Sequence, residues 1–266
     1  MSEVVLKAEA VTMQFGGLKA LSEFTLELRP RELVGLIGPN GAGKTTAFNA
    51  LSGVYAPSAG RVLLGGEVVN GLKPHQVCRQ GLARTFQNIR LFKALTVLDN
   101  VRVACHAHGH GPLWQSLALT GGHYGREKTM EDRALELLAF MGLVDRKDEI
   151  AKNLPYGLQR RLEIARALAT GPKVLCLDEP AAGMNPTETA KLMTLIHDIR
   201  EKFHVAVLLI EHDMKLVMGI SERLIVLDHG VTIAAGTPEQ VKRDPKVIEA
   251  YLGVEAGHKP IDTETA

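Results

Sequence analysis

The chain has 266 residues, of which 45% are hydrophobic and 23% are charged, and its formal net charge is +1. This composition is ordinary for a soluble globular protein, and the small net charge argues against a protein that binds nucleic acid over its whole surface. The longest apolar runs, such as residues 205–210, are strand-sized and too short to span a bilayer.

The N-terminal residues show no basic region followed by a long apolar one, so we expect no signal peptide. Three cysteines, Cys78, Cys105 and Cys176, share no Cys-x-x-Cys spacing. This usage is typical of reduced thiols in a cytosolic protein. We therefore expect any work at a membrane to be done through a partner.

Two strands are predicted in the first thirty residues, where apolar and polar side chains alternate over 5–11 and 24–28. Between them, Phe15 begins a glycine-bearing turn that runs to Ala20. An aromatic face accepts a flat ring, so Phe15 is a candidate for stacking on a nucleotide base. The alternative is a core residue that closes a strand.

A phosphate-binding loop is predicted at residues 38–45, which match G-x-x-x-x-G-K-[ST] at every fixed position. An apolar run over 33–37 predicts a buried parallel strand before the loop, and 46–52 predict a helix after it that Gly53 ends. Glycines let backbone N–H groups converge on phosphates, and the helix N-terminus adds partial positive charge. The candidate nucleotide-binding residues are Gly38, Pro39, Asn40, Gly41, Ala42, Gly43, Lys44, Thr45 and Thr46.

Two residues of this loop have predicted chemical roles. Lys44 can bridge the β- and γ-phosphates, and the Thr45 hydroxyl can ligate Mg²⁺. A nucleotide that carries phosphates and Mg²⁺ are therefore the expected ligands of this loop.

The next segment predicts a hairpin around Gly65-Gly66, a short helix over 73–81 and a strand over 82–87. That strand ends on Gln87. A glutamine at a strand end beside a nucleotide site can reach both the metal and the attacking water. The alternative for Gln87 is an ordinary surface residue.

An inserted helical lobe is predicted from residue 88 to about 153, where the periodicity is helical and strand patterns are not evident. Its middle, residues 105–110, is rich in histidine, but a second cluster at ligand spacing is missing, so we favour an exposed loop over a metal site. Trp114 follows, either in a partner-facing apolar patch or in an internal helix.

Two carboxylates, Asp178 and Glu179, end an apolar strand predicted over 174–179, which follows a predicted helix over 162–169. We expect this strand to lie parallel beside the strand at 33–37, which places Asp178 near Mg²⁺ and Glu179 near the γ-phosphate. The alternative is a helix cap at the strand end, and the phosphate loop makes the catalytic role the stronger hypothesis.

The last predicted elements are a buried strand over 205–210, which ends in Glu211-His212, and a hairpin of 224–228 with 231–234. From about Lys259 the tail is polar and has few apolar anchors, so we expect it to be frayed.

The order of these motifs resembles one family closely, the ATP-binding subunits of ABC transporters. The phosphate loop, Gln87, the segment 154–159 before a helix, the carboxylates at 178–179 and His212 occur in that family's order and approximate spacing. The resemblance covers residues 3–253 and looks closest to the branched-chain amino-acid importer branch. The passages that carry it are 84–87, 160–168, 180–186 and 210–220.

The resemblance implies an α/β fold: a P-loop NTPase core with a mixed sheet flanked by helices, an N-terminal antiparallel β region and an inserted helical subdomain. The expected division is one ATP-binding domain over 3–253, followed by a flexible tail over 254–266. Within that domain the core covers 3–87 and 154–235, the helical subdomain 88–153 and a C-terminal helical segment 236–253.

It also implies an ATPase that works as a head-to-tail dimer with an identical or related subunit. In this arrangement Phe15 stacks on adenine, Gln87 senses Mg²⁺ and the lytic water, and Asp178 helps to hold the metal. Glu179 polarises the water and His212 contacts the γ-phosphate. Gly157 in the signature segment of one subunit closes over the ATP of the other.

The implied partners are transmembrane permease subunits and, indirectly, a solute-binding protein, which places the chain on the cytoplasmic face of the inner membrane. Import of another small polar solute, such as an amide or urea, is the alternative inside the family. A soluble ATP-dependent switch is the alternative outside it, although such proteins usually carry two of these domains or a long coiled-coil insertion, and the sequence shows neither. A module that no longer hydrolyses ATP is disfavoured by Lys44, Asp178, Glu179 and His212.

One segment departs from the family pattern, in which the signature usually reads L-S-G-G-Q. Pro155 and Tyr156 fill its second and third positions, and Leu158 replaces the glutamine. Pro155 has neither a hydroxyl nor a backbone N–H, so it cannot donate to a phosphate, whereas Gly157 keeps the close backbone approach. We favour the hypothesis that Gly157 and the helix N-terminus suffice, over a weakened composite site.

Overall fold

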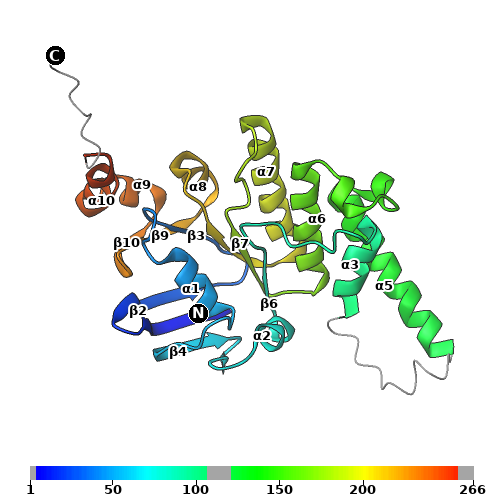
Figure 1. Cartoon of the computed structure of the whole chain (residues 1–266), viewed down its shortest axis with the longest axis horizontal. Coiled ribbons are helices and arrows are strands. Elements are labelled where there is room, and N and C mark those ends of the chain that lie inside the picture. The colour runs from blue at the N-terminus through cyan, green and yellow to red at the C-terminus, as the bar shows by residue number, and fades with distance from the viewer. Residues whose placement is uncertain (1–3, 107–120, 257–266) are drawn as a thin grey trace, which may run out of the picture.

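The computed structural model describes residues 4–106 and 121–256, and within them the strands form two sheets (Figure 1). One is a four-stranded antiparallel sheet and the other a six-stranded mixed sheet. Helices cover the larger sheet and extend into a helical lobe on one side. This arrangement confirms the predicted α/β class.

The smaller sheet has the order β2-β1-β4-β5. Its strands are β1 (Leu6–Phe15), β2 (Leu18–Leu28), β4 (Ala59–Leu64) and β5 (Glu67–Val68). The hairpin around Gly65-Gly66 is confirmed. The first two strands are longer than expected, because β1 and β2 pair up to Phe15 and Leu18 and leave a two-residue turn at 16–17.

The larger sheet has the order β10-β9-β3-β8-β7-β6. The loop strand β3 (Leu33–Ile37) pairs in parallel with β8 (Ala206–Ile210) and β9 (Arg223–Asp228), and β10 (Val231–Gly236) closes the edge as the antiparallel partner of β9. On the other side β7 (Val174–Asp178) and β6 (Leu82–Arg84) follow β8.

Two expectations about this sheet were wrong. The carboxylate strand β7 does not lie directly beside β3, because β8 pairs with both of them. The strand β6 ends at Arg84 and not at Gln87, so Gln87 lies in the irregular segment that follows the strand.

The two faces of the larger sheet are buried against different layers. Residues such as Cys176 and Leu208 join a core with the smaller sheet and helix α1 (Lys44–Leu51). Their neighbours Leu177 and Leu209 join a second core with the lobe and α7 (Pro186–Phe203). Because successive strand side chains point to opposite faces, this alternation is what a parallel strand covered on both sides requires.

The helical lobe is confirmed as helical and contains α3 (Val97–Cys105), α5 (Gly121–Phe140) and short 3-10 turns at Val144–Arg146 and Ala151–Asn153. Both α-helices pack against α6 (Tyr156–Ala169), which starts six residues before the expected 162. Thr96 caps α3 by accepting a hydrogen bond of 3.0 Å from the Asp99 N–H. The division of the chain into core and helical subdomain remains a prediction.

The remaining helices are short. They are α2 (Pro74–Gln80), α8 (Met214–Ile220), α9 (Pro238–Lys242) and α10 (Pro245–Ala256), the last of which reaches three residues into the expected tail. Over the described ranges, no helix combines the length and apolarity that crossing a membrane would demand.

The possible metal site at 105–110 and Trp114 lie almost wholly outside the described residues, as does the tail from 257. In 4–106 and 121–256, no group of three His, Cys, Asp or Glu side chains is placed to hold a metal. Cys78, Cys105 and Cys176 are free thiols.

A tight contact lies behind the phosphate loop at Gly35, in the middle of β3. A Cβ built there would meet Val217 Cγ1 at 2.5 Å, Leu224 Cδ2 at 2.7 Å and Ser221 Oγ at 2.9 Å. These atoms belong to α8, the residue that follows it and β9. The close packing of α8 and β9 against β3 therefore requires a residue without a side chain at position 35.

We predict that Gly35→Ala lowers the free energy of unfolding by about 1–3 kcal/mol, because the new methyl group overpacks this layer. Urea denaturation of the purified chain measures the loss. Gly17→Ala is the matched control, since a Cβ at Gly17 meets no atom within 4 Å. Equal stability of the two variants would show that the α8 layer yields without cost.

Candidate functional site

The phosphate loop is shaped by close backbone packing. A Cβ on Gly38 would overlap the Leu227 carbonyl oxygen of β9, and one on Gly43 would lie 2.7 Å from the Ala20 carbonyl oxygen. Gly41 and Gly43 adopt φ angles of 80° and 99°, in the left-handed region that suits glycine. The glycines predicted from the sequence pattern therefore fit the backbone that the loop adopts.

Lys44 is the first residue of α1 and its side chain is buried. The Nζ atom donates to the Gly38 carbonyl oxygen at 2.7 Å and to the Pro39 carbonyl oxygen at 2.8 Å. Burial lowers the pKa of Lys44, and the negative charges of Glu179 and Asp178 oppose that shift. The ammonium group of Lys44 is thus held by carbonyl oxygens of the loop. The phosphate oxygens of a bound nucleotide can replace these carbonyl oxygens as its hydrogen-bond acceptors.

A pocket of about 460 Å³ brings together side chains that lie far apart in the sequence. Lys44, Thr45 and Thr46 come from α1, and Gln87 and Glu179 come from the segments after β6 and β7. The rest of the lining is Leu18, Lys19, Ala20, Asn40, Gly41, Ala42, Gly43, His229 and Gly230. The sequence-predicted loop, glutamine and second carboxylate therefore share one site.

Phe15 is the last residue of β1 and pairs with Leu18, which lines this pocket. Phe15 is 44% exposed. Its ring packs edge-on against the ring of Tyr55, with the two ring centroids 5.2 Å apart. The core alternative is therefore wrong, and the ring is accessible to a flat partner. The pocket lining starts at Leu18, just after the turn that Phe15 opens.

Glu179 lies directly after β7 and is held in a left-handed conformation with φ of 45°. Its N–H donates to the Ile210 carbonyl oxygen of β8 at 2.9 Å. Its Oε2 accepts a hydrogen bond of 2.8 Å from Gln87 Nε2. Gln87 is exposed, and its side-chain amide is hydrogen-bonded to the second carboxylate.

His212 lies beside this pair and is largely exposed, at 61%. Its Nδ1 is 3.9 Å from Glu179 Oε2 and 3.8 Å from Glu211 Oε2. These distances are longer than hydrogen bonds, so His212 is near the carboxylates without being fixed by them.

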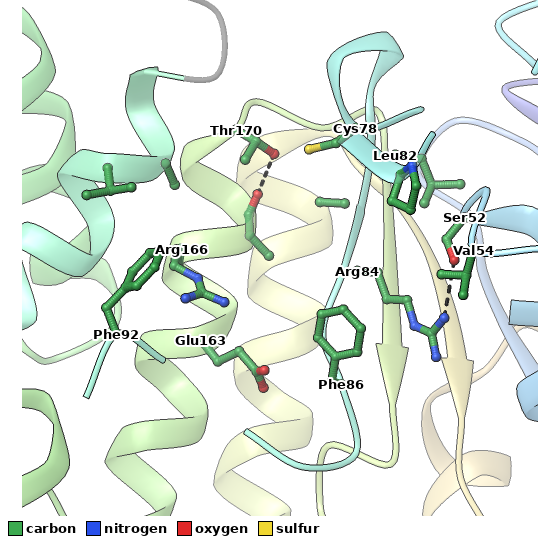
Figure 2. A pocket seen from close by; sticks show the side chains of 15 residues that line it. Ser52, Val54, Cys78, Leu82, Arg84, Phe86, Phe92, Glu163, Arg166 and Thr170 are labelled. Atoms are coloured by element: carbon green, nitrogen blue, oxygen red, sulfur yellow. Dashed lines mark hydrogen bonds between the residues drawn. The ribbon is translucent and has the colours of Figure 1, made fainter. Parts of the chain in front are cut away.

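Asp178 is buried behind the pocket and is paired with Arg84 of β6. Arg84 Nη2 donates to Asp178 Oδ2 at 2.9 Å, and Arg84 Nη1 donates to Asn49 Oδ1 at 2.6 Å. Figure 2 shows Arg84 directed toward Ser52, whose Oγ accepts at 3.2 Å. Burial raises the pKa of Asp178, and the hydrogen bond and charge of Arg84 oppose the rise.

Three charged residues of the site were given no role by the sequence analysis. Arg84 pairs with Asp178, the buried Arg160 of α6 donates to the Gln87 carbonyl oxygen at 2.8 Å, and the buried Glu211 accepts from the Ala181 N–H at 2.9 Å. The signal available for Arg84 was a lone charge in an otherwise apolar strand. Burial raises the pKa of Glu211.

Gly157 is not brought to the nucleotide pocket of its own chain. It lies near the start of α6, in a separate pocket of about 210 Å³ that Pro155, Leu158, Met184 and Glu188 also line. Pro155 is the N-cap of α6, and its carbonyl oxygen accepts from the N–H groups of Leu158 and Gln159 at 3.0 Å each. Pro155 therefore starts the helix through its carbonyl group.

A third pocket, of about 330 Å³, opens between the larger sheet and the lobe (Figure 2). It is largely apolar and includes side chains that are unusually exposed for their type: Phe92 at 47%, Val103 at 45% and Val54 at 43%. Arg84 and Phe86, which flank the approach to Gln87, also line it. An apolar hollow thus lies directly behind the segment that carries Gln87.

These residues fit a magnesium nucleotide. A loop of backbone N–H groups at the start of α1, a lysine held by carbonyl oxygens and two adjacent carboxylates are the donor set expected for a triphosphate with a divalent cation.

Comparison with known proteins gives the same result. A profile of the family described as "ABC transporter" matches residues 21–182, and one described as "Branched-chain amino acid ATP-binding cassette transporter" matches residues 231–257. The high-affinity branched-chain amino acid transport ATP-binding protein LivG of Escherichia coli K12 is 49% identical over 253 residues, which cover 95% of this chain and 99% of LivG.

Solved structures share the fold. An ATP-binding cassette of an ABC transporter in its ADP conformation has a TM-score of 0.82 and 31% identity, over 94% of this chain and 99% of that one. A dimeric post-hydrolysis ATP-binding cassette bound to ADP and Pi has a TM-score of 0.72 and 25% identity, over 88% of this chain and 98% of that one.

We predict that Arg84→Met costs about 3 kcal/mol of unfolding free energy near neutral pH, because it leaves the buried Asp178 carboxylate unpaired. Since burial has raised the folded pKa of Asp178, the native state takes up this proton at a higher pH than the unfolded state does. The deficit should therefore shrink as the pH falls through the folded pKa, because the neutral acid needs no partner.

Urea denaturation at several pH values measures this, with Arg84→Met/Asp178→Asn as the control. The double variant carries no titrating group at this position, so its deficit relative to Asp178→Asn should not depend on pH. A deficit in Arg84→Met that stays constant with pH would contradict the pairing of these charges.

Proposed function

Because the chain belongs to the ATP-binding subunits of ABC transporters, in the branched-chain amino-acid branch, we propose that it hydrolyses ATP to power an importer of branched-chain amino acids. The observation that carries the proposal is the single pocket in which Lys44 of the phosphate loop faces Gln87 and Glu179. The similarity to LivG over 95% of the chain supports the solute class.

The phosphate loop and the β1–β2 turn are the segments that we assign to ATP binding. The backbone N–H groups of 39–45 and the N-terminus of α1 meet the phosphates, and Lys44 moves from the Gly38 and Pro39 carbonyl oxygens to phosphate oxygens. Phe15 offers an exposed ring for the adenine beside the pocket. The phosphate oxygens are thus bound by N–H groups and a lysine, and the flat base by an aromatic ring.

Thr45, Gln87 and Asp178 are the residues that would hold Mg²⁺, which neutralises phosphate charge when bound. Thr45 and Gln87 line the pocket. Asp178 is buried and is held by Arg84, whose hydrogen bond and positive charge oppose the rise of its pKa and so favour the ionised form that a metal ligand needs.

Glu179 is the residue that we assign to the attacking water. It is adjacent to the pocket, 20% exposed, and oriented by the Gln87 amide. In this position it can accept a proton from water or orient it toward the γ-phosphate, while His212 supplies a further polar contact to that phosphate. Positioning and charge neutralisation carry the catalysis.

A second copy of the chain, or a related subunit, completes the site. Gly157 and Pro155 lie in a pocket away from their own phosphate loop, so they are available to a nucleotide held by a partner. The dimeric cassette that shares the fold supports this arrangement. Since Pro155 offers no donor, the partner's phosphate would be met by the backbone after it and by the N-terminus of α6.

The apolar pocket between sheet and lobe is the surface that we assign to a transmembrane permease subunit. Its exposed Phe92, Val103 and Val54 need an apolar partner, and Arg84 and Phe86 connect it to the Gln87 segment. Docking there would hold the chain on the cytoplasmic face of the inner membrane, and a solute-binding protein would act on the permease from the other side.

We predict that Glu179→Gln abolishes steady-state ATP turnover, with a loss of about 100-fold or more, because the amide cannot accept the proton of the water. ATP affinity should be retained and an ATP-stabilised dimer should accumulate on size-exclusion chromatography. Glu67→Gln, on the exposed strand β5, is the matched control and should hydrolyse ATP normally. Turnover of Glu179→Gln at the parental rate would remove Glu179 from the mechanism.

We predict that the chain, co-purified with its permease and reconstituted in proteoliposomes, drives ATP-dependent leucine uptake that isoleucine and valine inhibit and urea does not. Uptake of an amide or urea in place of leucine would overturn the solute class and leave the ATPase assignment standing.

Val103→Asp tests the docking surface in the same assay. It places a charge in the apolar pocket, so co-purification and uptake should both be lost while the isolated chain still binds ATP. Val144→Asp, at a lobe position of similar exposure (37%), is the control and should retain both. Normal uptake by Val103→Asp would place the permease elsewhere.

A further inference from the structure

Two fully buried charges on α6 have no part in the mechanism described above. Arg160 is 0% exposed and Glu163 is 2% exposed, and they form an ion pair one helical turn apart at 2.8 Å. Desolvation makes such a pair no better for stability than two apolar side chains of similar size. What the pair holds is therefore more informative than its own contribution to stability.

The pair holds the backbone on both sides of Gln87. Arg160 Nη1 donates to the Phe86 carbonyl oxygen at 2.6 Å and Nη2 to the Gln87 carbonyl oxygen at 2.8 Å. Glu163 Oε1 accepts from the Arg90 N–H at 3.0 Å. Figure 2 shows Glu163 and Phe86 at the same end of the apolar pocket.

The Thr85 N–H still donates to the Cys176 carbonyl oxygen of β7 at 2.9 Å, but the segment 86–92 after it has no regular secondary structure. A planar guanidinium that donates to two successive carbonyl oxygens restrains a backbone in both position and direction. The Gln87 side chain in turn donates to Glu179 at 2.8 Å. The position of this amide relative to Glu179 is therefore set from α6.

The same helix begins in the signature segment. Arg160 Nη2 donates to the hydroxyl oxygen of Tyr156, the first residue of the helix, at 3.1 Å, and Gly157 follows Tyr156. Arg160 therefore connects the start of α6, where a second subunit's nucleotide is proposed to bind, to the backbone of Gln87.

We propose that Arg160, braced by Glu163, is a positioning residue that ties the signature helix to the Gln87 segment and so places the Gln87 amide against Glu179. It is fully buried, does not line the nucleotide pocket and acts through Gln87. The inference rests on the proposed ATPase function and assigns it a residue that couples the helix to the hydrolytic pocket.

The first variant is Arg160→Lys, which keeps the charge for Glu163 but replaces the two-pronged donor with a single ammonium group. We expect kcat for ATP hydrolysis by the full chain to fall roughly 10- to 100-fold, since small misplacements near the reacting atoms have effects of this size. The KM for ATP should change less than about twofold, because the phosphate loop is untouched. Arg146→Lys, in an exposed Arg–Glu pair of the same spacing, is the control and should be normal.

The second variant, Arg160→Met/Glu163→Met, separates positioning from stability. It removes both buried charges, so urea denaturation should show a smaller loss of stability than Arg160→Met alone. Its kcat should nevertheless stay low. Recovery of parental kcat in a stable double variant, or parental kcat in Arg160→Lys, would overturn the proposal.

The third measurement is a cycle with Gln87→Ala. If Arg160 acts through Gln87, Arg160→Lys should lower kcat little further in the Gln87→Ala background, whereas independent effects would multiply. Multiplying effects would overturn the inference. Absence of ATPase activity in the parental chain would instead overturn the proposed function, so the two failures are distinguishable.

Discussion

The chemistry of this protein depends on the register of a buried parallel sheet. Leu36 of β3 and Asp178 of β7 both pair with Ile210 of β8, so the three strands end at the same edge. The phosphate loop and Glu179 follow those ends directly, and His212 is the second residue after β8. A slip of one residue would turn each strand's side chains to the opposite face and separate these groups. The apolar cores on both faces of the sheet prevent that slip.

Much of this arrangement could be predicted from the sequence, because short-range patterns encode it. The strands β3 and β8 and the hairpin of β9 and β10 were expected within one or two residues, and the loop motif identified α1 and its glycines. Strand order was not encoded in this way. Nothing in residues 174–178 states whether β7 lies next to β3 or one strand away, since any apolar strand can pair with any other.

Other differences arise where side chains replace regular backbone pairing. The strand β6 was expected to reach Gln87, but it stops at Arg84 because the carbonyl oxygens of 86 and 87 bond to Arg160 and not to a neighbouring strand. Composition alone places arginine at the surface. Arg84 and Arg160 are buried because each finds acceptors that lie more than seventy residues away in the chain, at Asp178 and at the Phe86 and Gln87 carbonyls respectively. Local sequence patterns carry no record of such partners.

The exposure of the pocket explains why one chain is not a complete catalyst on the proposed mechanism. Glu179 is 20% exposed and His212 is 61% exposed, so bulk water reaches the groups that would act on the γ-phosphate. Electrostatic stabilisation of a transferring phosphoryl group is far stronger when water is excluded. Lys44 supplies positive charge on the phosphate-loop side of the pocket. The side of the pocket that is open to water has to be closed by another protein surface. The start of α6, with its helix N-terminus, is suited to an anion, and Arg160 connects that helix to Gln87. The movement that closes the pocket with the start of α6 would then also place Gln87 against Glu179.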